Sequence, residues 1–81
     1  MLLFEKTLVR ANETRSFLIQ YAPSIGWESR ETANQRIEQR QHTDWHHVER
    51  RVAIFAERVA ALLGSGWRDA AGLSVSHDQG E

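Results

Sequence analysis

The sequence contains no cysteine, which excludes disulfide bonds, thiolate metal ligands and a cysteine nucleophile. It also lacks long apolar runs, and none approaches the roughly 18 residues that a membrane-spanning helix needs. The apolar start is interrupted at Glu5 and Lys6 and is too short for a signal peptide. We therefore expect a cytoplasmic protein that does not associate with membranes.

The sequence also lacks an excess of positive or of negative charge. Ten Lys and Arg stand against eleven Asp and Glu, which gives a formal net charge of −1. No overall basic field draws the chain to nucleic acid, and no acidic excess indicates a disordered chain. A length of 81 residues suits one domain with a small core. Because no disulfide can stabilise that core, self-association is the expected source of additional buried surface.

Residues 2–21 carry apolar side chains whose spacing suits a first, short helix. Phe4, Leu8 and Ala11 follow one another at intervals of four and three residues, which is the helical period. A strand over Leu3–Val9 is the open alternative, because short apolar runs suit both structures.

A second, longer helix is predicted after a break at residues 22–26, where Pro23 disfavours helix in the preceding residue. This helix begins near Ser29, a good N-cap, and contains neither glycine nor proline before Gly64. Whether it is one helix, or two helices that meet near residues 41–44, stays open.

Apolar residues in the second half of the long helix recur at alternating intervals of three and four, the pattern of a coiled-coil or bundle seam. Such a seam packs against another helix, so it predicts a dimer interface. The predicted interface residues are Trp45, Val48, Val52, Phe55, Val59 and Leu62. The predicted fold class is therefore all-α: a helical hairpin of one short and one long helix, paired into a homodimeric bundle. We expect a single helical domain over residues 1–67 and a flexible tail over 68–81.

A basic stripe follows one side of the predicted long helix. Five cationic or ionisable side chains would project within about 60° of one another on a continuous helix. They are Arg36, Arg40, His47, Arg51 and Arg58. Residues 30–44 have few apolar side chains, so we interpret this polar half as a contact surface rather than as core. The candidate partner-binding residues are Arg30, Arg36, Arg40, His47, Arg51 and Trp27. The alternative is a helix flank whose arginines pair with glutamates of a neighbouring helix.

Histidines and carboxylates also gather on one face of that helix, within about 80° of one another. A His-x-x-x-His pair on one helix face is a common way to hold Zn²⁺, and carboxylates can complete the coordination. The candidate metal ligands are His42, His46, Glu38 and Glu49. The alternative is a solvated polar face, because the other residues of the known protease and di-iron motifs are missing. We expect no cofactor.

Residues 25–37, IGWESRETANQRI, resemble the turn and recognition helix of bacterial helix-turn-helix proteins. The resemblance implies DNA binding through this segment, with Arg30 among the contacts. The segment departs from the motif at Glu28, which adds one residue before Ser29. Ile37 then falls off the core position that the motif expects.

No residue pattern supports catalysis, since the serines lie in no nucleophile elbow and no glycine-rich phosphate loop is present. We therefore expect a non-enzymatic protein-binding regulator, adaptor or inhibitor that self-associates through its long helix and docks on a larger protein. A DNA-binding transcriptional regulator that uses residues 25–37 is the first alternative. A metal-binding helical bundle that uses His42 and His46 is the second.

Overall fold

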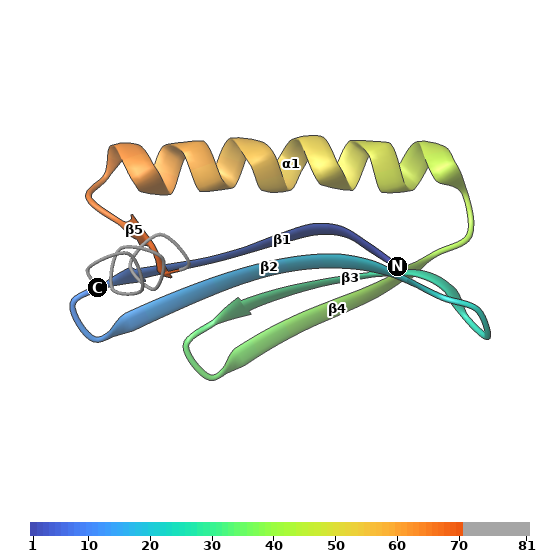
Figure 1. The fold of residues 1–81 in the computed structure, drawn as a ribbon, viewed down its shortest axis with the longest axis horizontal. Helices are drawn as coiled ribbons and strands as arrows, with labels where there is room; N and C mark the ends of the chain where they lie inside the picture. The colour runs from blue at the N-terminus through green and yellow to red at the C-terminus, as the bar shows by residue number, and fades with distance from the viewer. Residues whose placement is uncertain (71–81) are drawn as a thin grey trace, which may run out of the picture.

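A computed structural model describes residues 1–70 of the chain. They form one antiparallel sheet with a single long helix packed on one of its faces (Figure 1). The strand order is β4-β3-β2-β1-β5, so the first four strands form a simple meander. The elements are β1 (Leu2–Arg10), β2 (Glu13–Ala22), β3 (Gly26–Ala33), β4 (Arg36–His42), α1 (Trp45–Gly64) and β5 (Arg68–Asp69).

The predicted all-α helical hairpin is wrong, and so is the coiled coil, because residues 2–42 form strands and turns. The deciding pattern is the period of two in β2, where Phe17 and Ile19 are buried on one face of the sheet. The open alternative of a strand over Leu3–Val9 is correct. The polar half of the supposed long helix is explained by β4, an edge strand of which every residue except His42 is exposed.

Local residue chemistry sets the two shorter turns. Ala11 and Asn34 have positive φ angles of 54° and 58°, and each begins a two-residue connection between antiparallel strands. Asn34 tolerates this conformation well. It also ties its turn to the start of β2, since its backbone N–H donates to the Thr14 carbonyl at 2.9 Å and its side-chain oxygen accepts from the Thr14 N–H at 2.9 Å.

The predicted break at residues 22–26 coincides with the turn between β2 and β3. Gly26 has a φ of +89°, and a Cβ atom at this position would lie 3.2 Å from the His42 carbonyl oxygen. A side chain is therefore disfavoured at Gly26 both by backbone conformation and by the close approach of β4.

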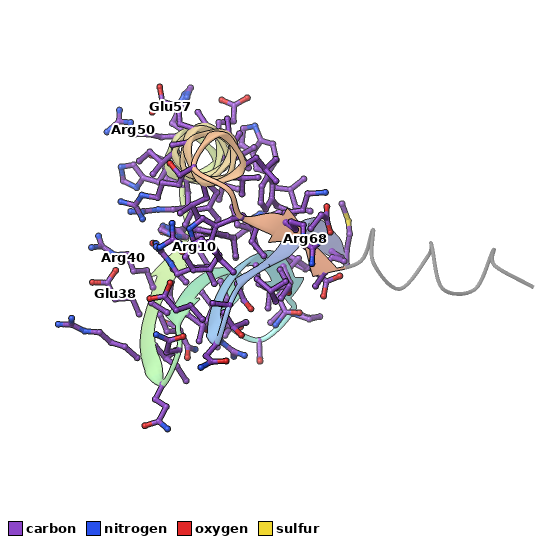
Figure 2. The ribbon with its side chains drawn as sticks, turned by 90° about the vertical axis from the view of Figure 1, so that its left-hand side faces the viewer. Arg10, Glu38, Arg40, Arg50, Glu57 and Arg68 are labelled. Atoms are coloured by element: carbon purple, nitrogen blue, oxygen red, sulfur yellow. The ribbon has the colours of Figure 1, made fainter. Side chains whose placement is uncertain are left out.

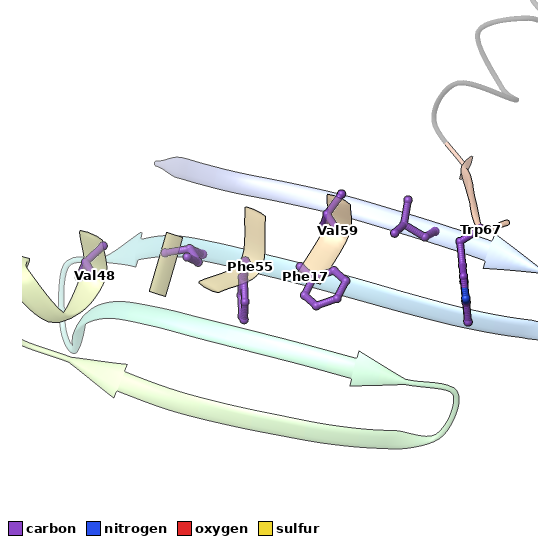
Figure 3. Close-up of a cluster of buried hydrophobic side chains, with 7 residues drawn as sticks. Phe17, Val48, Phe55, Val59 and Trp67 are labelled. Carbon is purple, nitrogen blue, oxygen red and sulfur yellow. The ribbon is translucent and has the colours of Figure 1, made fainter. Parts of the chain in front are cut away.

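The helix α1 starts at an N-cap, Asp44, whose side chain accepts a hydrogen bond from the His46 N–H at 2.9 Å. Its buried face meets the sheet in the single apolar core of the described residues (Figure 3). The rings of Phe17 and Phe55 pack edge to face with centroids 5.2 Å apart. The core consists of Leu8, Phe17, Ile19, Val48, Phe55, Val59 and Trp67.

Most of the seam that predicted a dimer interface thus packs against the sheet of the same chain, whereas Trp45 at its start is 47% exposed. Val48, Phe55 and Val59 are 0%, 1% and 7% exposed within one protomer. A helix that packs on a sheet needs the same apolar stripe as a helix that packs on another helix. The spacing of the apolar residues therefore could not show which of the two the helix packs on.

The chain returns to the sheet after α1 and adds β5 beside β1. Trp67 closes that end of the core, and the Arg10 guanidinium lies 4.9 Å from its ring centroid. Lys6 pairs with Asp69 at 2.5 Å. Residues 68 and 69 of the predicted tail are therefore part of the sheet, whereas residues 71–81 lie outside the described residues. Within residues 1–70, no helix is long and apolar enough to cross a membrane.

Replacing Phe55 by Ala should lower the free energy of unfolding by about 3–5 kcal/mol, because it leaves a cavity between α1 and the sheet. Urea denaturation followed by circular dichroism measures this change. Leu63→Ala is the matched control, since Leu63 is 45% exposed and its truncation should change stability by no more than about 0.5 kcal/mol. Equal effects of the two substitutions would contradict the packing of α1 on the sheet.

Candidate functional site

A groove runs between β4 and α1 on the helix-covered side of the sheet. Side chains alternate along a strand, so Arg40 and His42 face the helix, as do their register partners Ser29 and Trp27 on β3. Figure 2 shows Arg40 of β4 and Arg50 of α1 on the same side of the molecule. The groove is therefore bordered by one strand and one helix that are adjacent in the sequence.

At one end the groove widens into a cavity of about 250 Å³, here called the basic groove. Two of its residues come from β4 and four from α1, and no carboxylate is among them. They are Arg40, His42, His47, Arg50, Arg51 and Ile54. The site thus gathers three arginines and two histidines around one recess, in a chain whose overall charge is close to zero.

The arginines of the basic groove are not neutralised. Within residues 1–70, none of Arg40, Arg50 and Arg51 forms an ion pair with a carboxylate. Burial lowers the pKa of Arg51, and the neighbouring cations Arg40 and Arg58 lower it further, whereas the charges of Glu31 and Glu38 raise it. A guanidinium nevertheless stays charged near neutral pH. Clustered cations that form no ion pair repel one another, so an anion bound among them would be stabilised.

His42 is fixed in the wall of the groove by a hydrogen bond with Ser29. The Ser29 hydroxyl oxygen lies 2.8 Å from His42 Nε2, and Ser29 itself is only 2% exposed. Burial lowers the pKa of His42 below its usual 6.5, and the charges of Arg51, His47 and Arg40 lower it further. The ring is therefore largely neutral at pH 7. A serine this deeply buried is not accessible as a nucleophile, so the pair positions the ring.

The groove changes character towards the other end of β4. There Glu31 binds both Arg15, at 3.1 Å, and Arg58, and its side chain is only 14% exposed. A second cavity of about 270 Å³ is lined by Glu31, Ala33, Arg36 and Glu38. This mixed-charge end does not favour an anion, so we place the candidate anion site at the basic groove alone.

Three aromatic side chains gather at the end of the sheet next to the basic groove. Trp27 contacts Tyr21 and Trp45, with ring centroids 5.2 and 5.4 Å apart. Tyr21 is 41% exposed and Trp45 is 47% exposed. Trp27 is the register partner of His42, which lines the groove. This aromatic cluster, Tyr21, Trp27 and Trp45, therefore adjoins the basic groove and offers ring surface to solvent.

The structure separates the residues that the sequence grouped as partner-binding. Arg40, His47 and Arg51 line the basic groove, although Arg40 lies on a strand and the others on a helix. Trp27 belongs to the aromatic cluster, and Arg36 lines the second cavity. Arg30 lies on the opposite face of the sheet, where it pairs with Glu28 at 3.5 Å.

Two of the five arginine and histidine residues of the basic groove were absent from that predicted set. Arg50 was missed because a single continuous helix would turn it about 100° away from Arg51. His42 was considered only as a metal ligand. The signal that could have found both is the clustering of cations immediately before and after Asp44, once that residue is taken as the start of the helix.

The metal hypothesis and the helix-turn-helix hypothesis lose their structural basis. His42 lies on β4, whereas the His46 side chain is 85% exposed on α1 and lies 3.9 Å from Glu49. Among residues 1–70, no group of three or more His, Asp or Glu side chains is placed to hold a metal ion. Residues 26–33 form β3, so the segment that resembles a recognition helix is not helical.

Comparison with known proteins identifies no relative. No family model matches the chain, and no curated protein or solved structure matches it. The function of the groove is therefore inferred from its own side chains.

The His42 ring should titrate with a midpoint below pH 6.5 in the folded protein. The unfolded chain then binds more protons than the folded chain between that midpoint and pH 6.5. Consequently the titration of His42 does not reduce the free energy of unfolding above pH 6.5. As the pH falls through this window, it lowers the free energy of unfolding. NMR titration of the ring carbons, with His42→Gln to assign the signal, measures the midpoint. A midpoint at or above 6.5 would contradict the described environment of the ring.

Proposed function

We propose that this protein is a non-enzymatic binding protein whose basic groove binds the phosphate backbone of single-stranded nucleic acid. The observation that carries the proposal is the convergence of Arg40, Arg50 and Arg51 on one recess without ion-pair partners. Guanidinium groups bind phosphate oxygens by charge-assisted, often bidentate hydrogen bonds. The rings of His42 and His47 can add further hydrogen bonds to the same ligand.

The aromatic cluster favours a nucleic acid over an isolated phosphate ion. Proteins that bind single strands combine a positive groove for the backbone with aromatic side chains on which bases stack. Here the exposed rings of Tyr21 and Trp45 adjoin the arginines of the groove. A strand whose phosphates occupy the basic groove could therefore place neighbouring bases on the cluster.

A double helix fits the site less well. Proteins that read duplex DNA insert a projecting helix or strand pair into a groove of the nucleic acid. The cationic side chains of this protein instead line a recess between β4 and α1. Stacked bases inside a duplex would not reach the aromatic cluster, whereas bases of a single strand are free to do so.

Docking on a larger protein, as a regulator, adaptor or inhibitor, is the second candidate. An acidic protein segment would be attracted by the same unpaired arginines. It would make no use of the adjoining aromatic rings for stacking, which is why we place it second. We propose the cytoplasm as the site of action in either case, since the chain is free of cysteine.

Arg50→Glu should weaken binding of a fluorescently labelled single-stranded oligonucleotide by about tenfold or more at low salt, which corresponds to about 1.4 kcal/mol. Fluorescence anisotropy measures the affinity. Arg68→Glu is the matched control, because Arg68 is exposed on β5, at the edge of the sheet opposite to β4 and the groove. Binding that is equal for both variants, or that is absent from the unmodified protein, would overturn the proposal. Binding of an acidic peptide without binding of any oligonucleotide would support docking on a protein instead.

The salt dependence should also report the number of phosphates bound. If the three arginines each neutralise one phosphate, log K should fall against log salt concentration with a slope of about −2. Trp45→Ala should weaken binding by about 1–3 kcal/mol without changing that slope, because it removes a stacking surface and no charge. Leu63→Ala, an equally exposed position on the same helix, is the control and should leave affinity unchanged.

A further inference from the structure

The strand β4 is an unpaired edge of the sheet. One side of β4 pairs with β3 over all seven of its residues, whereas the other side has no partner strand in residues 1–70. The opposite edge of the sheet is partly occupied, since β5 pairs with Leu8 and Val9 of β1. An edge of this length leaves a row of backbone N–H and C=O groups available to another strand.

We propose that two copies of this protein associate by antiparallel pairing of their β4 strands about a two-fold axis at Gln39. Such a dimer joins the two sheets into one continuous sheet and keeps both helices on the same face. It requires no nucleic acid and goes beyond the function proposed above, although it would place a carboxylate of the second copy opposite Arg40 of the basic groove.

The charge pattern of β4 selects this register. A two-fold axis at Gln39 places Glu38 opposite Arg40 of the second copy and Arg40 opposite its Glu38. Opposite charges in directly facing positions stabilise a strand pair by about 0.2–1 kcal/mol each. It is also the only two-fold register in which all seven residues of β4 take part, because Gln39 is the middle residue of the strand.

The neighbouring registers are worse for the same reasons. With the axis at Glu38, the two glutamates face each other and Arg36 faces Arg40 in both halves of the pair. With the axis at Arg40, two arginines face each other at the centre, and β4 also loses two of its pairs. Charged edges usually prevent pairing by repulsion. In β4, by contrast, a glutamate and an arginine flank Gln39, so the register that pairs the full strand brings opposite charges together.

The remaining facing residues are compatible with that register. Arg36 meets His42 of the second copy, whose ring is largely neutral at pH 7. On the opposite face of the sheet, Ile37 meets Gln41, and the two copies of Gln39 face each other. Ile37 is 61% exposed in one protomer, so the pairing would cover part of an exposed apolar side chain. No like charges face each other at neutral pH.

Light scattering after size exclusion tests the inference on the full chain, with mass rising from 9.3 kDa towards twice that value as concentration increases. Glu38→Arg should raise the dissociation constant at least about tenfold, because it sets like charges opposite each other. The double variant Glu38→Arg/Arg40→Glu should restore dimerisation to within about threefold of the unmodified protein, since the ion pairs re-form with exchanged partners.

Glu57→Arg is the matched control, because it makes the same charge change on an exposed position of α1. Hydrogen exchange of the β4 amides should also slow as protein concentration rises. A chain that stays monomeric at high concentration would overturn the inference. So would a Glu38→Arg variant that dimerises as well as the control, or a double variant that folds but does not recover. These experiments measure molecular mass and hydrogen exchange. A failure to bind oligonucleotides would therefore contradict the proposed function without contradicting the dimer.

Discussion

The packing of the α1 apolar stripe against β1 and β2 determines the rest of the structure. A helix with its side chains is about 10–12 Å across, and strands lie about 4.8 Å apart. One helix that is seated on Leu8, Phe17 and Ile19 therefore cannot also cover β4 completely. The strip of sheet left beside the helix becomes the groove. The position of the site thus follows from where the apolar contacts are, and its chemistry from the polar residues at its margins.

Charge is segregated in this protein although its sum is close to zero. Glu31 forms ion pairs with two arginines, Arg15 and Arg58, at one end of the groove. Glu28 pairs with Arg30 on the other face of the sheet. Arg40, Arg50 and Arg51 of the basic groove take part in none of the ion pairs of residues 1–70. Net charge gave no indication of such a site, because it averages over surfaces that the fold keeps apart.

The sequence predicted some elements for sound reasons and misassigned others. The helix over 45–64 and the turn near Pro23 could be found, because helical period and proline act locally. The strands were missed because Phe4 and Leu8, on the same face of β1, are also spaced for a helix. Polar residues 30–44 looked like a helix without a core, whereas an edge strand needs few apolar residues. Arg40, His47 and Arg51 were grouped on one continuous helix that does not exist. They line one recess because β4 and the helix that follows it lie side by side.

The contacts at the end of α1 couple its length to that of the sheet. A helix of 20 residues spans about 30 Å at 1.5 Å per residue, and the nine residues of β1 span about 30 Å when extended. Only with this match can the chain leave β4 at one end of the sheet and bring Trp67 and β5 onto β1 at the other (Figure 1). The length of the helix therefore sets where the chain returns to the sheet. Inserting or deleting one turn would shift the chain end by about 5.4 Å, separating Trp67 from the core even if every apolar contact within the helix were retained.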